Sequence, residues 1–258
     1  MTKDASYPLL HNVLCSLILV ALLFGCSKSP EELARQKDLA TVKRIALVGF
    51  VGNSVAGRKS SDHEPLLKAT YEAFQKKASG NRDVVDIIPI EAVIKNDVYT
   101  SIAIKSLPNG VISPVAGLTR LKQISVQDIE GLSSALKVDG LLTITVNYSI
   151  NQENNASRYV LGAIPHCTLF IPSGRLVWGG ENEFLVAQQV ELPISLFSNS
   201  ALSLSLGLKW AAMGGPSEAD YIEMMKIATE SGRSMAAKTG ELLFDRLVND
   251  IRDARATR

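Results

Sequence analysis

The segment RIALVGF, residues 44–50, carries apolar side chains on both faces of an extended chain. A strand that is apolar on both faces is typical of the centre of a sheet that helices cover on each side. The next periodic segment, Pro65–Ala78, predicts an amphipathic helix, because its apolar residues recur at helical spacing: Leu67, Tyr71, Phe74 and Ala78. A central strand followed by such a helix indicates an α/β fold.

The remaining segments extend this βα beginning. In chain order we predict a strand at Asp83–Ile88, a short helix within Ile90–Tyr99, a helix at Ser125–Leu136, a strand at Gly140–Tyr148, a hairpin of Arg158–Pro172 and Arg175–Gln188 around Ser173-Gly174, and a long helix at Pro216–Arg258. Two early crossovers imply parallel pairing, and the hairpin adds antiparallel strands. The fold class is therefore a single-domain α/β sandwich with a mixed β-sheet and packed helices, in the order β-α-β-α-β-β-β-α.

The N-terminal segment has the features of a targeting signal. Val13–Phe24 is an apolar run of twelve residues, which is too short to span a bilayer as a helix but suits the core of a secretory signal. The residues Leu23, Phe24, Gly25 and Cys26 resemble a bacterial lipobox. In such a motif the signal peptidase cleaves before the cysteine, so Cys26 would be the lipidated residue. A plain signal peptide and an amphipathic anchor are the alternatives.

These features divide the chain into three parts. We expect residues 1–25 to be a lipoprotein signal peptide, residues 26–42 a lipidated tether, and residues 43–258 an α/β periplasmic domain. Acyl chains (palmitate among them) on Cys26 would hold the mature protein at a lipid bilayer. Ser27, which follows the cysteine, favours the outer membrane by resemblance to other bacterial lipoproteins.

Composition excludes several classes of protein. The 258 residues hold 27 basic and 26 acidic side chains, so a nucleic-acid binder that works through bulk positive charge is excluded. A hydrophobic fraction of 46% excludes a mostly disordered chain. Three cysteines exclude a disulfide-dense scaffold, and Cys167, within an apolar run, is predicted to be a buried small hydrophobe.

No combination of residues predicts catalysis. The glycine-rich segment from Gly52 to Ser60 resembles a phosphate-binding loop, but Arg58 interrupts the spacing that such a loop requires. The only histidines after the predicted signal, His63 and His166, have no second pair of metal ligands near them in sequence. We therefore expect no enzyme activity, no metal and no cofactor, with a nucleotide-binding enzyme as a remote alternative.

Residues 201–210 (ALSLSLGLKW) alternate strictly between apolar and small or polar side chains. On an extended chain one face would carry Leu202, Leu204, Leu206, Leu208 and Trp210, a pattern typical of a transmembrane β-strand and a possible membrane or partner contact. A half-buried ordinary strand and a helix are the alternatives. A pore would need a second such strand, for which Val98–Leu107 is the best candidate.

The lipobox, the strand at 44–50, the motif Asp139-Gly140-Leu141-Leu142 and the hairpin motif Ser173–Trp178 together resemble CsgG-like and TolB-amino-terminal-like lipoproteins of the bacterial cell envelope. That group includes the curli secretion channel and LpoB-type activators of penicillin-binding proteins. The resemblance implies an outer-membrane lipoprotein on the periplasmic face, without enzyme activity. Such a protein acts by contact with an envelope protein partner or by self-association, in assembly, secretion or peptidoglycan-synthase regulation. An oligomeric secretion pore is the alternative.

Overall fold

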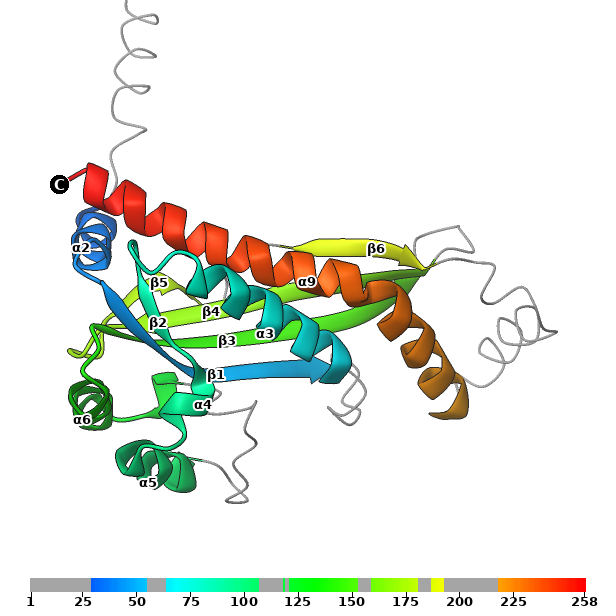
Figure 1. Ribbon diagram of the computed structural model, residues 1–258, viewed down its shortest axis with the longest axis horizontal. Coiled ribbons are helices and arrows are strands. Elements are labelled where there is room, and N and C mark those ends of the chain that lie inside the picture. The colour runs from blue at the N-terminus through cyan, green and yellow to red at the C-terminus, as the bar shows by residue number, and fades with distance from the viewer. Residues whose placement is uncertain are drawn as a thin grey trace, which may run out of the picture.

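The computed structural model describes residues 29–54, 64–106, 118, 121–152, 159–180, 187–192 and 218–258. These residues form a mixed α/β domain in which helices pack on both faces of one sheet (Figure 1). The helices are α2 (Pro30–Leu39), α3 (Glu64–Ser79), α4 (Ile90–Val93), α5 (Asp97–Ser106), the 3-10 turn η2 (Leu121–Gln123), α6 (Val126–Leu136) and α9 (Glu218–Ala256). The strands are β1 (Arg44–Ser54), β2 (Asp86–Ile88), β3 (Gly140–Gln152), β4 (Tyr159–Phe170), β5 (Leu176–Gly179) and β6 (Gln188–Leu192).

The predicted fold class is confirmed, and so is its pairing pattern. The strand order is β2-β1-β3-β4-β5, with β6 also paired to β4. β1 runs parallel to both β2 and β3, β3 pairs antiparallel with β4, and β4 and β5 form the predicted antiparallel hairpin around Ser173-Gly174. The parallel pairs follow from the helical crossovers that return the chain to the same end of the sheet.

The Asp139-Gly140 motif fixes the start of this sheet. One carboxylate oxygen of Asp139 accepts hydrogen bonds from the backbone N–H groups of Lys43 and Arg44, both at 2.9 Å. A Cβ at Gly140 would lie 2.8 Å from the side chain of Leu169, so a larger residue would crowd the neighbouring strand. The motif therefore joins β1 to β3 and has a structural role.

Four predicted strands differ from the structure. β1 continues to Ser54 instead of ending at residue 50, β3 continues to Gln152 instead of ending at Tyr148, and β2 is only three residues long instead of six. Of the predicted partner strand Arg175–Gln188, only Leu176–Gly179 forms β5, while Gln188 begins a separate strand, β6, that pairs with the other end of β4. Gly179 ends β5, because its φ of +71° is a left-handed conformation and a Cβ there would lie 2.1 Å from the carbonyl oxygen of Cys167.

Val98–Leu107, the candidate second strand of a pore, is helical throughout its described part, since α5 covers Asp97–Ser106. Its N-terminus is set by Asn96, whose side-chain oxygen accepts from the N–H groups of Val98 and Tyr99. An Asn in this position satisfies backbone donors at the start of a helix. That pore prediction is wrong for this segment.

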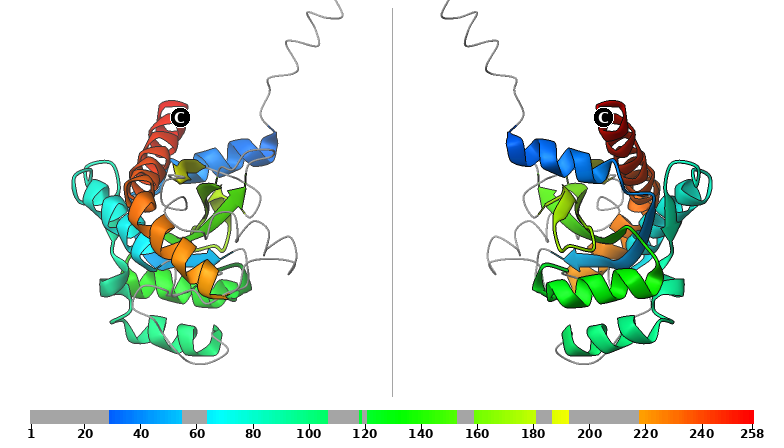
Figure 2. Two further views of the ribbon diagram at one scale, coloured as in Figure 1. Left: turned by 90° about the vertical axis from the view of Figure 1, so that its right-hand side faces the viewer. Right: turned by 90° about the vertical axis from the view of Figure 1, so that its left-hand side faces the viewer.

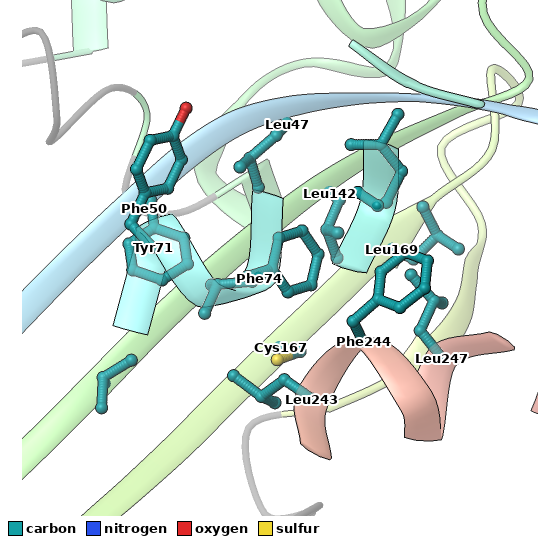
Figure 3. Packing of buried hydrophobic residues seen from close by; sticks show 14 of the residues in the cluster. Leu47, Phe50, Tyr71, Phe74, Leu142, Cys167, Leu169, Leu243, Phe244 and Leu247 are labelled. Atoms are coloured by element: carbon teal, nitrogen blue, oxygen red, sulfur yellow. The ribbon is translucent and has the colours of Figure 1, made fainter. Parts of the chain in front are cut away.

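One face of the sheet is covered by α3 and α9, which lie side by side along it (Figures 1 and 2). Aromatic rings from β1, α3 and α9 pack edge to face in this layer (Figure 3), with the ring centres of Phe74 and Phe244 5.7 Å apart. Phe50 packs against Tyr71 in the same way at 5.1 Å. All four rings are at most 9% exposed, so this face forms the main core.

Small residues allow α3 and α9 to approach closely. A Cβ at Gly240 would lie 2.1 Å from the backbone oxygen of Thr70, which only a glycine avoids. Thr70 also holds the layers together through its hydroxyl, 2.7 Å from the Tyr148 hydroxyl and 2.9 Å from the backbone oxygen of Ala236. Burial raises the pKa of Tyr148 far above its ordinary value, so this tyrosine stays neutral in the network.

The opposite face is covered by α4, α5, η2 and α6, which form a second and smaller cluster with β1 and β3. Tyr99 lies fully buried at its centre and donates a hydrogen bond to the carbonyl oxygen of Val48 at 3.0 Å. Gly49 follows Val48 at an irregularity in the β1–β3 register. A Cβ there would overlap the carbonyl of Leu118 at 1.7 Å, so this face also depends on one close backbone approach.

Candidate functional surfaces

Helix α2 occupies the place where the sequence predicted a tether. Ser29 caps the helix by accepting a hydrogen bond from the Glu32 N–H at 3.1 Å, and Pro30 starts the first turn. Glu31 and Glu32 place negative charge at the positive end of the helix dipole. The prediction of a tether is therefore wrong for residues 30–39, which are helical. The capping serine, the proline and the two glutamates of the first turn favour this helix.

Polar contacts from two distant parts of the chain, the region of β5 and the end of α9, hold α2 and the residues after it. Arg35 donates to the carbonyl oxygen of Gly179 at 3.0 Å, and Asp38 forms an ion pair with Arg175. Arg255, in the last turn of α9, donates to the carbonyl oxygen of Val42 at 2.7 Å. Leu39, Ala40 and Val42 are buried beneath these contacts, so the segment is docked on the domain and does not hang from it.

The outer face of α2 remains exposed. Leu33 is 54% exposed, and Lys37, one turn later, is exposed on the same side. At 100° per residue these two positions point away from Arg35 and Leu39, which face the domain. Leu33 lies between exposed Glu32 and half-buried Ala34, so this face of α2 presents one large apolar side chain among charged ones.

A second candidate surface is the groove between α5 and α6, which we call the α5–α6 groove. The groove encloses about 310 Å³ and is lined by Asp97, Val98, Ser101, Ile102, Gln127, Asp128 and Gly131. Val98 is 39% exposed at its side, and Val126 at the start of α6 is 55% exposed. Gly131 has no atom within 4 Å of a built Cβ, so the absence of its side chain keeps the groove open.

The helix ends that flank this groove are firmly capped. Ser125 accepts from the Asp128 N–H at 3.1 Å and donates its own hydroxyl to the Asp128 carboxylate at 2.8 Å. Buried Ile129 and Leu132 hold α6 to the sheet, and Tyr99 and Ala103 hold α5. The groove is thus a surface with a fixed shape, bordered by the carboxylates of Asp97 and Asp128.

The hairpin motif Ser173–Trp178 has a structural role in this fold. Gly174 adopts a φ of +77° in the turn, and Arg175 holds α2 through Asp38. Trp178 is 5% exposed and donates its indole N–H to Asp250 at 2.8 Å, where Arg246 also donates. These contacts tie β5 to both the first and the last described helix.

Cys167 is a buried hydrophobe, as predicted. Its side chain is 0% exposed in the main core (Figure 3), and burial raises the pKa of the thiol far above its ordinary value. His166 is half-buried on the opposite face of β4, which separates the two side chains as strand geometry requires. Within the ranges the structure describes, no group of three His, Cys, Asp or Glu side chains could hold a metal ion.

The phosphate-loop-like motif does not begin as such a loop does. Gly52 lies inside β1, paired with Val146, whereas a phosphate-binding loop starts where its strand ends. The rest of the motif, from 55 onward, and His63 lie outside the described residues. Among the helices that the structure describes, none is long and apolar enough to cross a bilayer.

The predicted site residues lie outside the described ranges: Leu23, Phe24, Gly25, Cys26, Leu202, Leu204, Leu206, Leu208 and Trp210. The surfaces described above were missed by the sequence analysis. The signal Ser29-Pro30-x-Glu32 could have located α2, but no sequence signal separates exposed Val98 and Val126 from buried valines.

No protein-family model matches the chain, and no curated protein matches it. Solved structures with similar folds include lipoprotein GNA1162 from Neisseria meningitidis, at 18% identity and a TM-score of 0.35 over 66% of this chain and 96% of that one. The LpoB C-terminal domain from Salmonella enterica matches at 10% identity and a TM-score of 0.27, over 62% and 97% of the two chains. A hypothetical protein from Chlamydia trachomatis matches at 9% identity and 0.32, over 78% and 96%. Values this low do not place the chain in a family.

Proposed function

We propose that this protein is an outer-membrane lipoprotein, anchored through acylated Cys26 on the periplasmic face, that works as a non-enzymatic accessory factor by contact with another envelope protein. The observation that carries the proposal is the apolar run Val13–Phe24, which Gly25 and Cys26 follow directly and complete to the lipobox-like Leu23–Cys26. More than one acyl chain makes such anchoring stable. The resemblance to CsgG-like and LpoB-type lipoproteins implies roles in assembly, secretion or peptidoglycan-synthase regulation.

The partner contact is assigned to the α5–α6 groove. Exposed Val98 lines the groove and offers apolar area, and the other lining residues include the carboxylates of Asp97 and Asp128 but no basic side chain. Complementary charge selects partners and apolar burial supplies affinity. The occupant is therefore a protein segment that presents a basic side chain flanked by apolar ones.

The anchor is tested by growing cells that express the full chain with labelled palmitate. We expect label on the wild-type protein and none on Cys26→Ala, which should leave the membrane fraction. Cys167→Ala is the matched control. It removes a buried cysteine and leaves Cys26 in place, so this variant should keep the label. Equal labelling of Cys26→Ala and wild type, or an intact mass that shows an uncut leader, would contradict the proposal.

The groove is tested by placing a photo-crosslinking amino acid at Val98 or Val126 in intact cells and identifying the captured protein by mass spectrometry. We expect both positions to capture one envelope protein, and Asp97→Lys to abolish the capture by repelling its basic side chain. A crosslinker at exposed Lys68 on the α3 side is the control. Unchanged capture in Asp97→Lys would rule out the proposed charge complementarity.

A second candidate function, an oligomeric secretion pore, is favoured by the alternating pattern of residues 201–210. Shared β-strands would give detergent-resistant rings on size exclusion. A monomer in every detergent extract would remove this candidate and leave the accessory role.

A further inference from the structure

The connection between the proposed anchor and the folded domain is very short. Only Ser27, Lys28 and Ser29 separate Cys26 from Pro30, where α2 begins. Four residue steps span at most about 14 Å even when fully extended. The first turn of α2 is therefore held close to the lipid headgroups whenever Cys26 carries its acyl chains.

We propose that the outer face of α2, centred on Leu33, rests on the lipid surface and orients the domain, an inference that depends on the anchoring proposed above. A docked α2 cannot swing away from the domain without breaking its contacts. Those contacts come from β5 and from the end of α9, through Gly179, Arg175 and Arg255. The way α2 lies against the bilayer therefore sets the orientation of the whole domain.

The exposed residues of α2 suit a lipid interface. Leu33 lies three residues into the helix, about 4.5 Å along its axis from Pro30. It is one of only three large apolar side chains that are exposed in the described part of the chain. Glu32 beside it and Lys37 one turn later are charged and exposed, which keeps α2 at the level of the headgroups and out of the hydrocarbon.

The orientation places the partner groove away from the bilayer. In Figures 1 and 2, α2 and the C-terminal end of α9 lie at the top of the molecule, while α5 lies at the bottom. Val126, at the start of α6, is 55% exposed and so matches Leu33 at 54%. The two side chains are equally exposed, Leu33 on α2 and Val126 on α6, which packs on the face of the sheet opposite α9.

Fluorescence quenching of the acylated full-length protein tests this orientation. Leu33→Cys and Val126→Cys are each labelled with a maleimide fluorophore, in protein inserted from outside into phosphatidylethanolamine and phosphatidylglycerol vesicles that carry a nitroxide on the headgroup. Cys15 lies before the proposed cleavage point, acylated Cys26 is blocked, and the buried thiol of Cys167 does not react. The introduced cysteine is then the only labelled site.

We expect the headgroup nitroxide to quench the fluorescence of the probe at 33 strongly. The fluorescence of the probe at 126 should be the same as in vesicles without nitroxide. A nitroxide deep in the acyl chain should quench position 33 less than the headgroup nitroxide does. Equal quenching at 33 and 126, or none at 33, would overturn the inference, and a second copy or a partner protein would then cover Leu33. Intact mass is measured on the same sample, so a missing acyl group, which refutes the anchor itself, is distinguished from an acylated protein that holds α2 off the bilayer.

Discussion

The two faces of the sheet are built differently. On the face covered by α3 and α9, aromatic rings pack edge to face and the glycine at 240 brings two helices into backbone contact. On the face covered by α5 and α6, Val98 and Val126 stay in water, and Val98 lines a groove of about 310 Å³. Among the side chains that the structure describes on α3 and α9, no large apolar one is exposed, so the role of the first face is stability. The second leaves apolar surface available at little cost to the fold, which is what a contact surface requires.

The largest expected difference between the faces comes from truncating one apolar side chain on each. Phe244→Ala removes a ring that packs against Phe74, and we expect a loss of about 3–5 kcal/mol in the free energy of unfolding. Val126→Ala removes an exposed side chain and should change the stability by less than about 0.5 kcal/mol. Chemical denaturation followed by circular dichroism measures both. Similar losses in the two variants would contradict the proposed division of roles.

Glycine-to-alanine substitutions in helices provide a comparison with identical chemistry. Gly240→Ala adds a methyl group 2.1 Å from the Thr70 backbone oxygen, and forcing α3 and α9 apart should cost about 1–3 kcal/mol. Gly131→Ala adds the same group to open space inside α6 and should stabilise by about 0.5–1 kcal/mol. The melting temperatures should therefore move in opposite directions. A stabilised Gly240→Ala would show that the close approach of the helices is not required.

The smallest effect concerns the buried tyrosines at high pH. Burial raises the pKa of Tyr99, on the α5 side, from its ordinary value of 10.0 to about 12, whereas the pKa values of Tyr71 and Tyr148 on the α3 side are raised further. Because the folded state favours neutral Tyr99, its contribution is present below pH 10 and is lost as the pH rises through about 12. Tyr99→Phe should cost about 1 kcal/mol at neutral pH through the lost bond to Val48 and should weaken the alkaline decline. Tyrosinate absorbance during an alkaline titration measures this; ionisation of the other two tyrosines before Tyr99 would contradict it.

Much of the fold could be predicted because its elements bury apolar faces at regular spacing. The helices α3 and α9 begin within two residues of their predicted starts, and Ser125 caps α6 as expected. Strand lengths were less predictable. The alternation in Arg175–Gln188 suggests one continuous strand, but the positive φ of Gly179 ends β5 early, and sequence alone does not show that conformation.

The docking of α2 on the domain escaped prediction for a different reason. Its segment is polar and charged, and its docking depends on hydrogen bonds and an ion pair to residues more than a hundred positions away, such as Gly179 and Arg175. Long-range polar contacts leave no periodicity in the sequence. The same limit applies to the α5–α6 groove, because whether Val98 and Val126 are covered depends on the packing angle of two helices and not on their composition.

The bond from Arg255 to the backbone at Val42 links residues 213 positions apart, and its companion to Ala40 links residues 215 apart. Chains are synthesised from the N-terminus, so the residues of α2 are made long before Arg255, which binds the backbone that follows them. Until the final turn of α9 forms, the residues after α2 lack the hydrogen bonds from Arg255, and α2 is held only by its contacts near β5. Formation of the Arg255 contacts is thus a late step in folding. A chain that ends just before Arg255 should keep the folded sheet but hold α2 less firmly.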